Sequence, residues 1–359
     1  MGFFGAKLKG RSLGVDIGTS QLKIVELNRW KGAANLATYG AIDLADDIIR
    51  SDSFAVQEKI YKSLKRVVRE SGVKGRSAIA SLPGFSVFTT ILKLPKMEEK
   101  ELSSAIKWEA KRYIPFPIEE IILDWEIVLP KAALRDQRAA AASASSEAEV
   151  FLTAVPKNIV KRYSNIFKKA DLNLIGLEPE ALALARALVN PAEEGGSMIV
   201  DIGATATEIC IVEDGFPKLN LSVDMGGNGL TRAIAQSLQV SFERAEQFKK
   251  DFGVSREKMG GEIPSAIKPV IDVIVEKIRH CSSLFANRGG KPVREIILSG
   301  GSAKLPEFVN YLSLFLDNKI VIADPWRKVI APQEMNKVLK ELGPNFDVAV
   351  GLALRELLP

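Results

Sequence analysis

Apolar positions in the first part of the chain follow the period of strands and then that of a helix. Three short runs rich in Val, Ile and Leu are typical of buried strands, at 13–18, 22–28 and 33–42. The next apolar residues recur at helical spacing after Ser53, a plausible N-cap: Val56, Ile60, Leu64 and Val67. A further strand at 77–82 ends in the turn signal Pro83-Gly84. Mixed strands and helices of this kind predict an α/β fold.

The segment 85–150 has an element order of its own. The pattern predicts a strand at 86–92, a helix at 98–113 that stops at IPFP, and a strand at 121–128. The following tract, AALRDQRAAAASASSEAE, has no periodicity and is predicted to be a mobile hairpin loop. We therefore expect this segment to be an inserted subdomain.

The rest of the chain completes the first half and then forms a second half. The pattern predicts strands at 151–155 and 174–178 and helices at 157–170 and 180–190, which we expect to return to the core of the first half. After the linker PAEEGGS, the predicted strands are 197–202, 205–212, 216–223 and 295–298. The predicted helices are 229–238, a mostly helical block at 241–288, 305–315 and 346–358.

A chain of 359 residues is longer than one core usually fills, so two domains are the default expectation. The expected division is a first domain at 1–84 and 151–195, the insertion at 85–150, a second domain at 196–240 and 290–359, and a helical subdomain at 241–289.

Composition excludes several classes of protein. A net charge of +5, from 49 basic and 44 acidic residues, is too small to indicate a nucleic-acid partner. No apolar run reaches the roughly 18 residues that span a bilayer, so no direct membrane span is expected, and the opening MGFFGAKLKG lacks a signal peptide. Two cysteines and a single histidine argue against a disulfide framework and histidine-based acid–base chemistry. We expect a cytoplasmic protein.

One strand–turn–strand motif occurs twice, as GVDIGTSQLKIVEL and IVDIGATATEICIV, with Asp16 and Asp201 at equivalent places. Glycine lets such a turn bend tightly and expose backbone N–H groups, which suit phosphate oxygens. An aspartate at the strand end can hold Mg²⁺ through water. A single copy of this motif is common in hairpins without function. Two copies a domain apart predict a polyphosphate that is bound from both sides of a cleft.

A third glycine site follows the predicted strand 295–298, in ILSGGSAKLP. Gly300, Gly301 and Ser302 would let the backbone approach a flat base and its ribose closely.

These motifs together resemble the superfamily of actin, sugar kinases and heat-shock-chaperone ATPases. The resemblance implies an actin-like ATPase fold, that is, two duplicated ribonuclease-H-like domains, here with an FtsA-type inserted subdomain, and it implies ATP with Mg²⁺ as cofactors. The residues that match the phosphate and adenosine motifs are Asp16, Gly18, Thr19, Ser20 and Lys23; Asp201, Gly203, Ala204 and Thr205; and Gly300, Gly301 and Ser302. GLEPEALALARAL and FDVAVGLALREL match the two connecting helices.

Three side chains keep alternative interpretations. Lys23 stands where a β/γ-phosphate contact is expected, although a lysine can also guard an edge strand. Glu246 and Lys249 match a nucleotide-sugar pair of the superfamily, but an ordinary solvated helix pair has the same spacing.

Hydrolysis needs a residue that orients the attacking water. By comparison with the superfamily, Glu178 and Glu180 are the best placed carboxylates, and Glu178 is the candidate catalytic residue, although Glu178-Pro179 is also a plain helix-start signal. Nucleotide binding is the main expectation, and slow hydrolysis stays open.

Within the FtsA-like group, the chain is most similar to the PilM family of type IV pilus assembly proteins. The similarity lies in GFFGAKLKGRSLGVDIGTSQLKIVEL, KWEAKRYIPFPIEEIILDWEIV and IGLEPEALALARA. It implies an ATP-binding adaptor that captures the cytoplasmic N-terminal tail of PilN in a groove between the first domain and the insertion. Other inner-membrane platform proteins and the assembly ATPase are implied as indirect partners. The protein would then be recruited to the inner face of the inner membrane through this partner.

Aromatic and apolar residues of the insertion are candidates for the groove or for the subdomain's own core: Trp108, Tyr113, Ile114, Phe116 and Trp125. Two other classes stay open: an FtsA-like filament protein, disfavoured because the chain stops at LRELLP without a terminal amphipathic helix, and a small-molecule kinase of the same fold.

Overall fold

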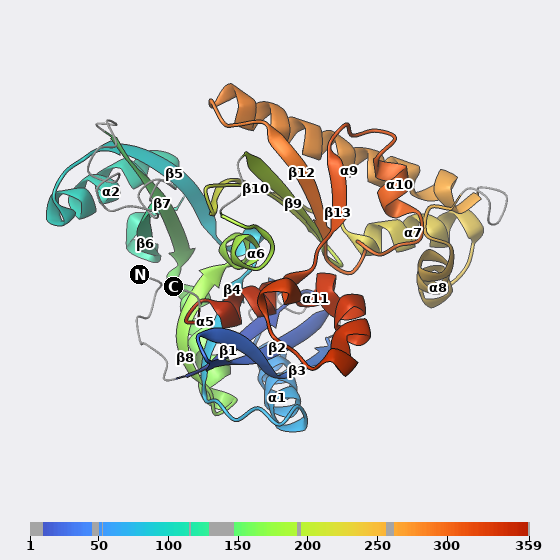
Figure 1. Cartoon of the computed structure of the whole chain (residues 1–359), viewed down its shortest axis with the longest axis horizontal. Coiled ribbons are helices and arrows are strands. Elements are labelled where there is room, and N and C mark those ends of the chain that lie inside the picture. Colours follow the sequence, from blue (N-terminus) through green and yellow to red (C-terminus); the bar gives the residue numbers. More distant parts are fainter. Residues whose placement is uncertain are drawn as a thin grey trace.

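The computed structural model describes residues 10–44, 50–51, 53–114, 116–128, 147–191, 195–255 and 262–357. Its strands form two five-stranded sheets and one three-stranded sheet (Figure 1). The two larger sheets have the same plan, with three antiparallel strands followed by two parallel ones.

The first sheet has the order β3-β2-β1-β4-β8. Its strands are β1 (Arg11–Ile17), β2 (Gln21–Trp30), β3 (Ala33–Asp43), β4 (Ser77–Leu82) and β8 (Asn173–Pro179). Helices α1 (Phe54–Glu70) and α5 (Lys157–Lys169) pack against each other and against this sheet on one face. Helices α6 (Glu180–Leu188) and α11 (Asn336–Leu354) pack on the other face.

The second sheet repeats this order as β11-β10-β9-β12-β13. Its strands are β9 (Gly196–Ile202), β10 (Thr207–Glu213), β11 (Phe216–Val223), β12 (Val293–Ser299) and β13 (Lys319–Ile322). The helices of this half are α7 (Gly227–Leu238), α8 (Phe242–Phe252), α9 (Glu262–Asn287) and α10 (Phe308–Leu312). One apolar core joins α6 and α11 to strands of both sheets, through Ile79 of the first and Ile199 and Ile297 of the second. The two connecting helices therefore form the middle layer of the molecule (Figure 1).

The crossing of the connecting helices depends on a glycine. A Cβ atom on Gly351 would lie 2.0 Å from the backbone oxygen of Ala183, a distance no side chain tolerates. We expect Gly351→Ala to force α6 and α11 apart and to lower the free energy of unfolding by about 1–3 kcal/mol, as overpacked cores do. Urea denaturation measures this change. The matched control is Gly301→Ala, whose Cβ would meet only Asn345 Oδ1 at 3.5 Å. Equal stability of the two variants would contradict the close crossing.

The three-stranded sheet has the order β5-β7-β6 and carries α2 (Glu99–Tyr113). Its strands are β5 (Phe88–Pro95), β6 (Ile121–Val128) and β7 (Glu147–Pro156). The strand expected at 151–155 is part of β7, which pairs with β5 and β6 along its length rather than with the first sheet. One long strand serves both parts: its end residue Val155 packs into the core of the first sheet. The predicted loop before it falls mainly on 129–146, outside the described residues.

Two elements near the end of the chain also differ from prediction. The helix expected at 346–358 begins at Asn336, so it runs through Pro344. Proline has no N–H for the carbonyl four residues earlier, but Lys304 Nζ donates to that oxygen, on Lys340, at 2.7 Å. The helix expected at 305–315 shortens to α10, and β13 was not predicted. The expected domain boundaries themselves stay a prediction.

Candidate functional site

A cleft of about 510 Å³ lies between the two halves of the molecule. Its walls are the β1–β2 turn, the β9–β10 turn, the starts of α7 and of the loop after β12, part of α8, and α11. Most of the residues predicted to bind the cofactor line it: Asp16, Gly18, Thr19, Ser20, Lys23, Asp201, Gly203, Ala204, Glu246, Lys249, Gly300, Gly301 and Ser302. The structure thus brings together motifs that are up to 286 positions apart in the sequence.

The two repeated turns have the same geometry. The Gly18 N–H donates to Gln21 O at 2.9 Å, and the Gly203 N–H donates to Ala206 O at 3.0 Å. A Cβ on either glycine would lie at about the same distance from that oxygen, 2.9 and 3.0 Å respectively. Both turns therefore need glycine to close tightly, and both line the cleft.

Asp16 is buried at the end of β1 and is held from two sides. Its Oδ1 accepts from Ser81 Oγ at 2.9 Å, and its Oδ2 accepts from Lys23 Nζ at 3.1 Å. Lys23 is directly opposite Asp16 in the β1–β2 register, facing the cleft rather than guarding an edge. Burial lowers the pKa of Lys23, but the carboxylates of Asp16, Asp201 and Asp347 outweigh it and raise the pKa overall. The ammonium group therefore stays charged and available to an anion.

The cleft holds more carboxylates than cations near the two turns. Burial raises the pKa of Asp201 to about 6, with Lys23 opposing and Asp16 adding to the shift. Burial and neighbouring carboxylates raise the pKa values of Glu180 and Asp347 well above their usual range. Asp347 Oδ2 is buried and has no hydrogen-bond partner among the described residues. Such a group of carboxylates favours a bound cation.

The charge pattern of the two hairpins differs at one position. Glu208 is opposite Asp201 in the β9–β10 register, as Lys23 is opposite Asp16 in β1–β2. Burial raises the pKa of Glu208 to about 7, and its carboxyl group packs against Gly84, where a Cβ would come within 2.3 Å. The sequence analysis missed Glu208, although the 185-residue offset of the repeat leads from Lys23 to it.

Glu208 gives a pH prediction for the protein without ligand. Because its folded pKa of about 7 exceeds the ordinary 4.5, the folded state holds a proton that the unfolded state releases between these values. This contribution to stability is complete below pH 4.5 and is lost as the pH rises through 7. Glu208→Gln should therefore reduce the loss of stability between pH 5 and 8, by on the order of 2 kcal/mol. Denaturation at several pH values measures the free energy of unfolding, with Glu70→Gln at an exposed position as the control. If Glu208→Gln showed the same pH dependence as the wild-type chain, the raised pKa of Glu208 would be contradicted.

The glycine loop after β12 lies against the second turn. Gly300 has φ = 80°, and a Cβ there would lie 2.4 Å from Asp201 Oδ1, so only glycine fits. Its N–H donates to Pro344 O at 2.8 Å, which ties the loop to α11. Gly301, by contrast, is open on its cleft side, with Asn345 Oδ1 as the nearest atom to an added Cβ.

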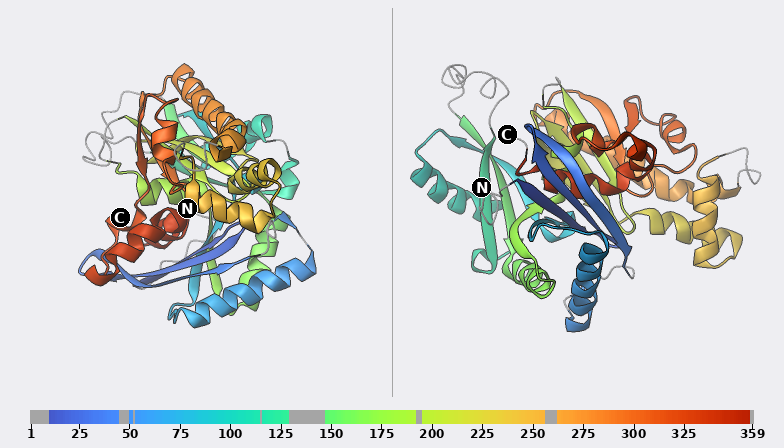
Figure 2. Two further views of the ribbon diagram at one scale, coloured as in Figure 1. Left: turned by 90° about the vertical axis from the view of Figure 1, so that its right-hand side faces the viewer. Right: turned by 60° about the horizontal axis from the view of Figure 1, so that its bottom comes forward.

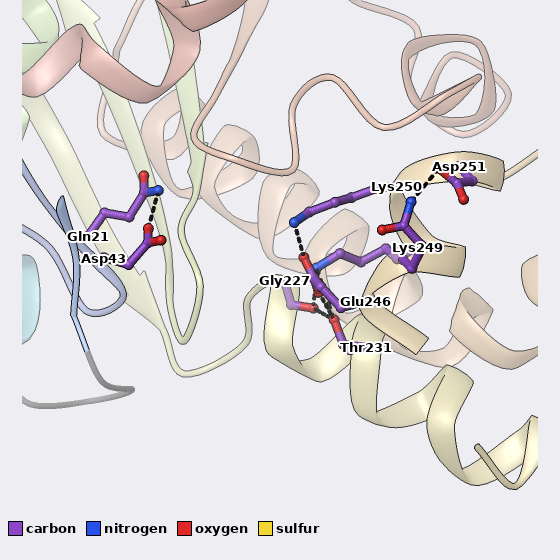
Figure 3. A network of polar contacts seen from close by, with 9 residues as sticks. Gln21, Asp43, Gly227, Thr231, Glu246, Lys249, Lys250 and Asp251 are labelled. Atoms are coloured by element: carbon purple, nitrogen blue, oxygen red, sulfur yellow. Dashed lines mark hydrogen bonds and ion pairs between the residues drawn. The ribbon is translucent and has the colours of Figure 1, made fainter. Parts of the chain in front are cut away.

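Lys249 and Glu246 form a network between α8 and α7 (Figure 3). Lys249 Nζ donates to Gly227 O at 3.2 Å and to Thr231 Oγ1 at 2.9 Å, and it pairs with Glu246 Oε2 at 2.7 Å. Burial lowers the pKa of Lys249. Lys250 Nζ pairs with Glu246 Oε1 at 3.3 Å. Lys249 is therefore not part of a solvated helix pair, and Glu246 lines the cleft while its carboxylate is held by Lys249, Lys250 and Thr231.

Two predicted site residues do not line the cleft. Glu178 is buried in ion pairs with Arg186 Nη1 at 2.7 Å and Arg355 Nε at 3.4 Å, which joins β8 to α6 and the end of α11. This geometry assigns Glu178 to the framework, and the connector carboxylate that faces the cleft is Glu180. Thr205 lines a smaller cavity of about 240 Å³ behind the turn, where its Oγ1 is buried without a hydrogen-bond partner among the described residues.

The residues of the cleft fit a nucleoside triphosphate with Mg²⁺. The two glycine turns line the cleft, and Lys23 supplies a cation there. In the part of the chain that the structure describes, no three His, Cys, Asp or Glu side chains converge closely enough to coordinate a metal directly. A volume of about 510 Å³ is that of an ordinary small-molecule site.

Known proteins resemble this chain over nearly its whole length. The cell division protein FtsA of Bacillus subtilis (strain 168) is 21% identical over 366 residues, which cover 90% of this chain and 81% of FtsA. A solved structure, the PilM-PilN type IV pilus biogenesis complex, has a chain that is 26% identical with a TM-score of 0.82, covering 97% of this chain and 99% of that one.

Other solved structures support the fold. The ethanolamine utilization protein EutJ from Carboxydothermus hydrogenoformans is 19% identical with a TM-score of 0.56, over 98% of this chain and 92% of that one. MreB5 of Spiroplasma citri, bound to ADP, is 13% identical with a TM-score of 0.51, over 96% and 95%. The predicted actin-like ATPase fold is thus confirmed.

Within the described residues, every helix is too short or too polar to cross a membrane. The model of the family described as type IV pilus assembly protein PilM matches residues 14–357. Together with the duplicated sheets and the shared cleft, this match shows that the chain belongs to the PilM family of type IV pilus assembly proteins.

Proposed function

We propose that this chain is a nucleotide-dependent adaptor of the type IV pilus assembly platform. It binds Mg-ATP between its two glycine turns and captures the cytoplasmic N-terminal tail of a PilN-type membrane protein. The observation that carries the proposal is the pairing of two separate cavities: the cleft between the halves and a groove beside the three-stranded sheet. The likeness to the chain of the PilM-PilN complex supports the choice of partner.

For the nucleotide, the proposed roles follow from position. The backbone of the two turns and Lys23 contact the phosphates, and Asp16 and Asp201 hold the hydrated metal. Gly300, Gly301 and Ser302 lie along the adenosine, and Glu246 accepts from the ribose hydroxyls. Bound Mg²⁺ neutralises charge on the phosphates. Binding is sufficient for an adaptor, so the proposal includes no hydrolytic step.

For the tail, the proposed site is a groove of about 480 Å³ between the first sheet's helices and the three-stranded sheet. We call it the tail groove. It is lined by Arg50, Phe85, Ser86, Val87, Phe88, Phe116, Pro156, Ile159 and Arg162. Three of these come from the segment that connects β4 to β5, one begins β5, and two come from α5. The groove therefore spans the junction between the first half and the insertion.

The chemistry of the tail groove suits an extended peptide. Its aromatic and aliphatic walls offer pockets for apolar side chains. Phe88 begins β5, which is an edge strand of its sheet. Of the five candidates in the insertion, Phe116 lines the groove, whereas Ile114 and Trp125 pack in the subdomain core. Trp108 and Tyr113 are exposed on α2 and line no part of it.

The experiment that tests the proposal is a titration of the full chain with a fluorescent peptide of the tail, with and without Mg-ATP. Saturable binding at one peptide per chain is expected, together with a separate saturable signal for Mg-ATP. Sedimentation in Mg-ATP tests the alternative of an FtsA-like filament. Long polymers that exclude the peptide would overturn the adaptor proposal in favour of that alternative.

A further inference from the structure

A strongly basic surface covers the outer face of the first sheet. It consists of α1, the connection that follows it, and α5, and we call it the α1/α5 face. Its exposed basic residues are Lys59, Lys62, Lys65, Arg66, Arg69, Lys74, Arg76, Lys157, Lys161, Lys168 and Lys169. Two acidic residues belong to the same segments, Glu58 and Glu70, and a third, Asp171, follows the end of α5. Eleven against three leaves a net charge of +8, which exceeds the +5 of the whole chain.

The two helices form one continuous surface. Helices α1 and α5 contact each other, and the right view of Figure 2 shows them, in blue and green, next to each other below the first sheet. Lys65 Nζ pairs with Asp171 Oδ2 at 2.5 Å, which joins α1 to the end of α5. Lys169 Nζ lies 4.5 Å from the ring centre of Phe54 at the start of α1. The charges therefore belong to a single patch rather than to two separate helices.

Folding does not require this concentration of charge. The apolar stripe of α1, with Ile60, Leu64 and Val67, anchors it to the sheet without help from the lysines. Salt bridges such as Lys62–Glu58 and Arg66–Glu70 neutralise a minority of the basic residues. Like charges at this density repel one another and oppose the compact state. An anionic partner would offset this repulsion.

We propose that the α1/α5 face lies against an anionic lipid bilayer. This inference rests on the proposed function, because the tail groove is partly lined by Ile159 and Arg162 of α5. A tail that emerges from a membrane protein and enters this groove brings α5 close to the headgroups. Juxtamembrane lysines and arginines are attracted to anionic lipid, and each exposed one that reaches the headgroups adds to the affinity of the face.

The composition of the face favours lipid over nucleic acid. Eight of the eleven residues are lysines, which bind phosphate as point charges, whereas arginine is the residue that recognises nucleic acids by planar contacts. The large apolar residue on the face is Phe54, which is 68% exposed at the start of α1 and suits the bilayer interface.

The test is co-sedimentation of the full chain with vesicles, in the absence of any tail peptide. We expect binding to vesicles of phosphatidylglycerol and phosphatidylcholine to exceed binding to phosphatidylcholine alone by about tenfold or more at low salt, and to vanish near 1 M salt, where the Debye length falls to about 3 Å. The triple variant Lys59→Glu, Lys74→Glu, Lys168→Glu should lose about tenfold or more in vesicle affinity.

A matched variant separates the face from the overall charge. Lys319 is exposed on β13 and Lys337 and Lys340 are exposed on α11, outside the α1/α5 face, and their replacement by glutamate changes the net charge equally. This control should keep most of the vesicle binding; an equal loss in both variants would overturn the proposal. So would tighter binding to a DNA duplex than to the anionic vesicles.

The same two variants also distinguish this proposal from the proposed function. Both are expected to bind the tail peptide in solution as the wild-type chain does, because none of the six lysines lines the tail groove. If the wild-type chain binds the peptide but does not bind anionic vesicles, only the proposal for the α1/α5 face is refuted. A chain that binds vesicles but not the peptide refutes the adaptor proposal alone.

Discussion

Asp16→Ala is expected to abolish the thermal stabilisation of this chain by Mg-ATP. Asp16 is buried between Ser81 Oγ and Lys23 Nζ at the end of β1, so its loss removes a metal-directed carboxylate and frees Lys23 from its position. At a hundredfold excess of nucleotide over its Kd, the wild-type chain gains about 2.7 kcal/mol, and the variant gains close to none. Thermal unfolding with and without Mg-ATP measures the difference.

The matching variant in the second half is Asp201→Ala, which should behave in the same way because the two turns have the same geometry. Asp272→Ala is the control, since Asp272 is half-exposed on α9, outside the cleft, and pairs with Lys268. Full stabilisation of both Asp16→Ala and Asp201→Ala by Mg-ATP would refute the two-sided phosphate site.

The second large effect is expected in the tail groove. Phe116 lines the groove and is 47% exposed in the absence of a peptide, so a bound tail would bury its ring. Truncation of a central aromatic anchor usually costs about 2 kcal/mol or more, which is roughly a thirtyfold loss of affinity. We expect Phe116→Ala to weaken binding of the tail peptide by this factor while leaving Mg-ATP binding intact.

Trp108→Ala is the matched control for this measurement. Trp108 is 66% exposed on α2, in the same inserted segment, but it does not line the groove. Fluorescence anisotropy of the labelled peptide measures both affinities. A larger loss for Trp108→Ala than for Phe116→Ala would move the binding surface from the groove to α2.

The sequence predicts the two glycine turns well because each is local. A strand, a tight turn and a second strand lie within about fifteen residues, and their repetition at an offset of 185 positions relates one half to the other. The same locality explains why Glu208 was missed. Its role depends on the register opposite Asp201 and on its burial against Gly84, which is more than a hundred residues away in the chain.

Two neighbouring carboxylates at the start of a helix show a second limit of prediction from sequence. Glu178 and Glu180 are two residues apart, and local pattern gives no reason to prefer one for the cleft. The choice is made by Arg186 and Arg355, which bind Glu178 from two other elements and draw it into the framework. Long-range partners of this kind are invisible in a single sequence.

The start of helix α11 shows that long-range partners also limit the prediction of secondary structure. Proline at position 344 is a reasonable place to expect the start of a helix. Lys304 nevertheless satisfies the carbonyl groups of Lys340 and Glu341, at 2.7 and 2.8 Å, and the helix continues past the proline. The carbonyl of Pro344 accepts from Gly300 instead, which connects the helix to the glycine loop of the cleft.

The central claim is that two opposed turns hold one nucleotide with its metal. A crystal structure of the full chain grown with Mg²⁺ and a non-hydrolysable ATP analogue tests it most directly. The account predicts a triphosphate between Gly18 and Gly203, with a hydrated metal next to Asp16 and Asp201. A nucleotide bound elsewhere, or a cleft without one at saturating concentration, would contradict it.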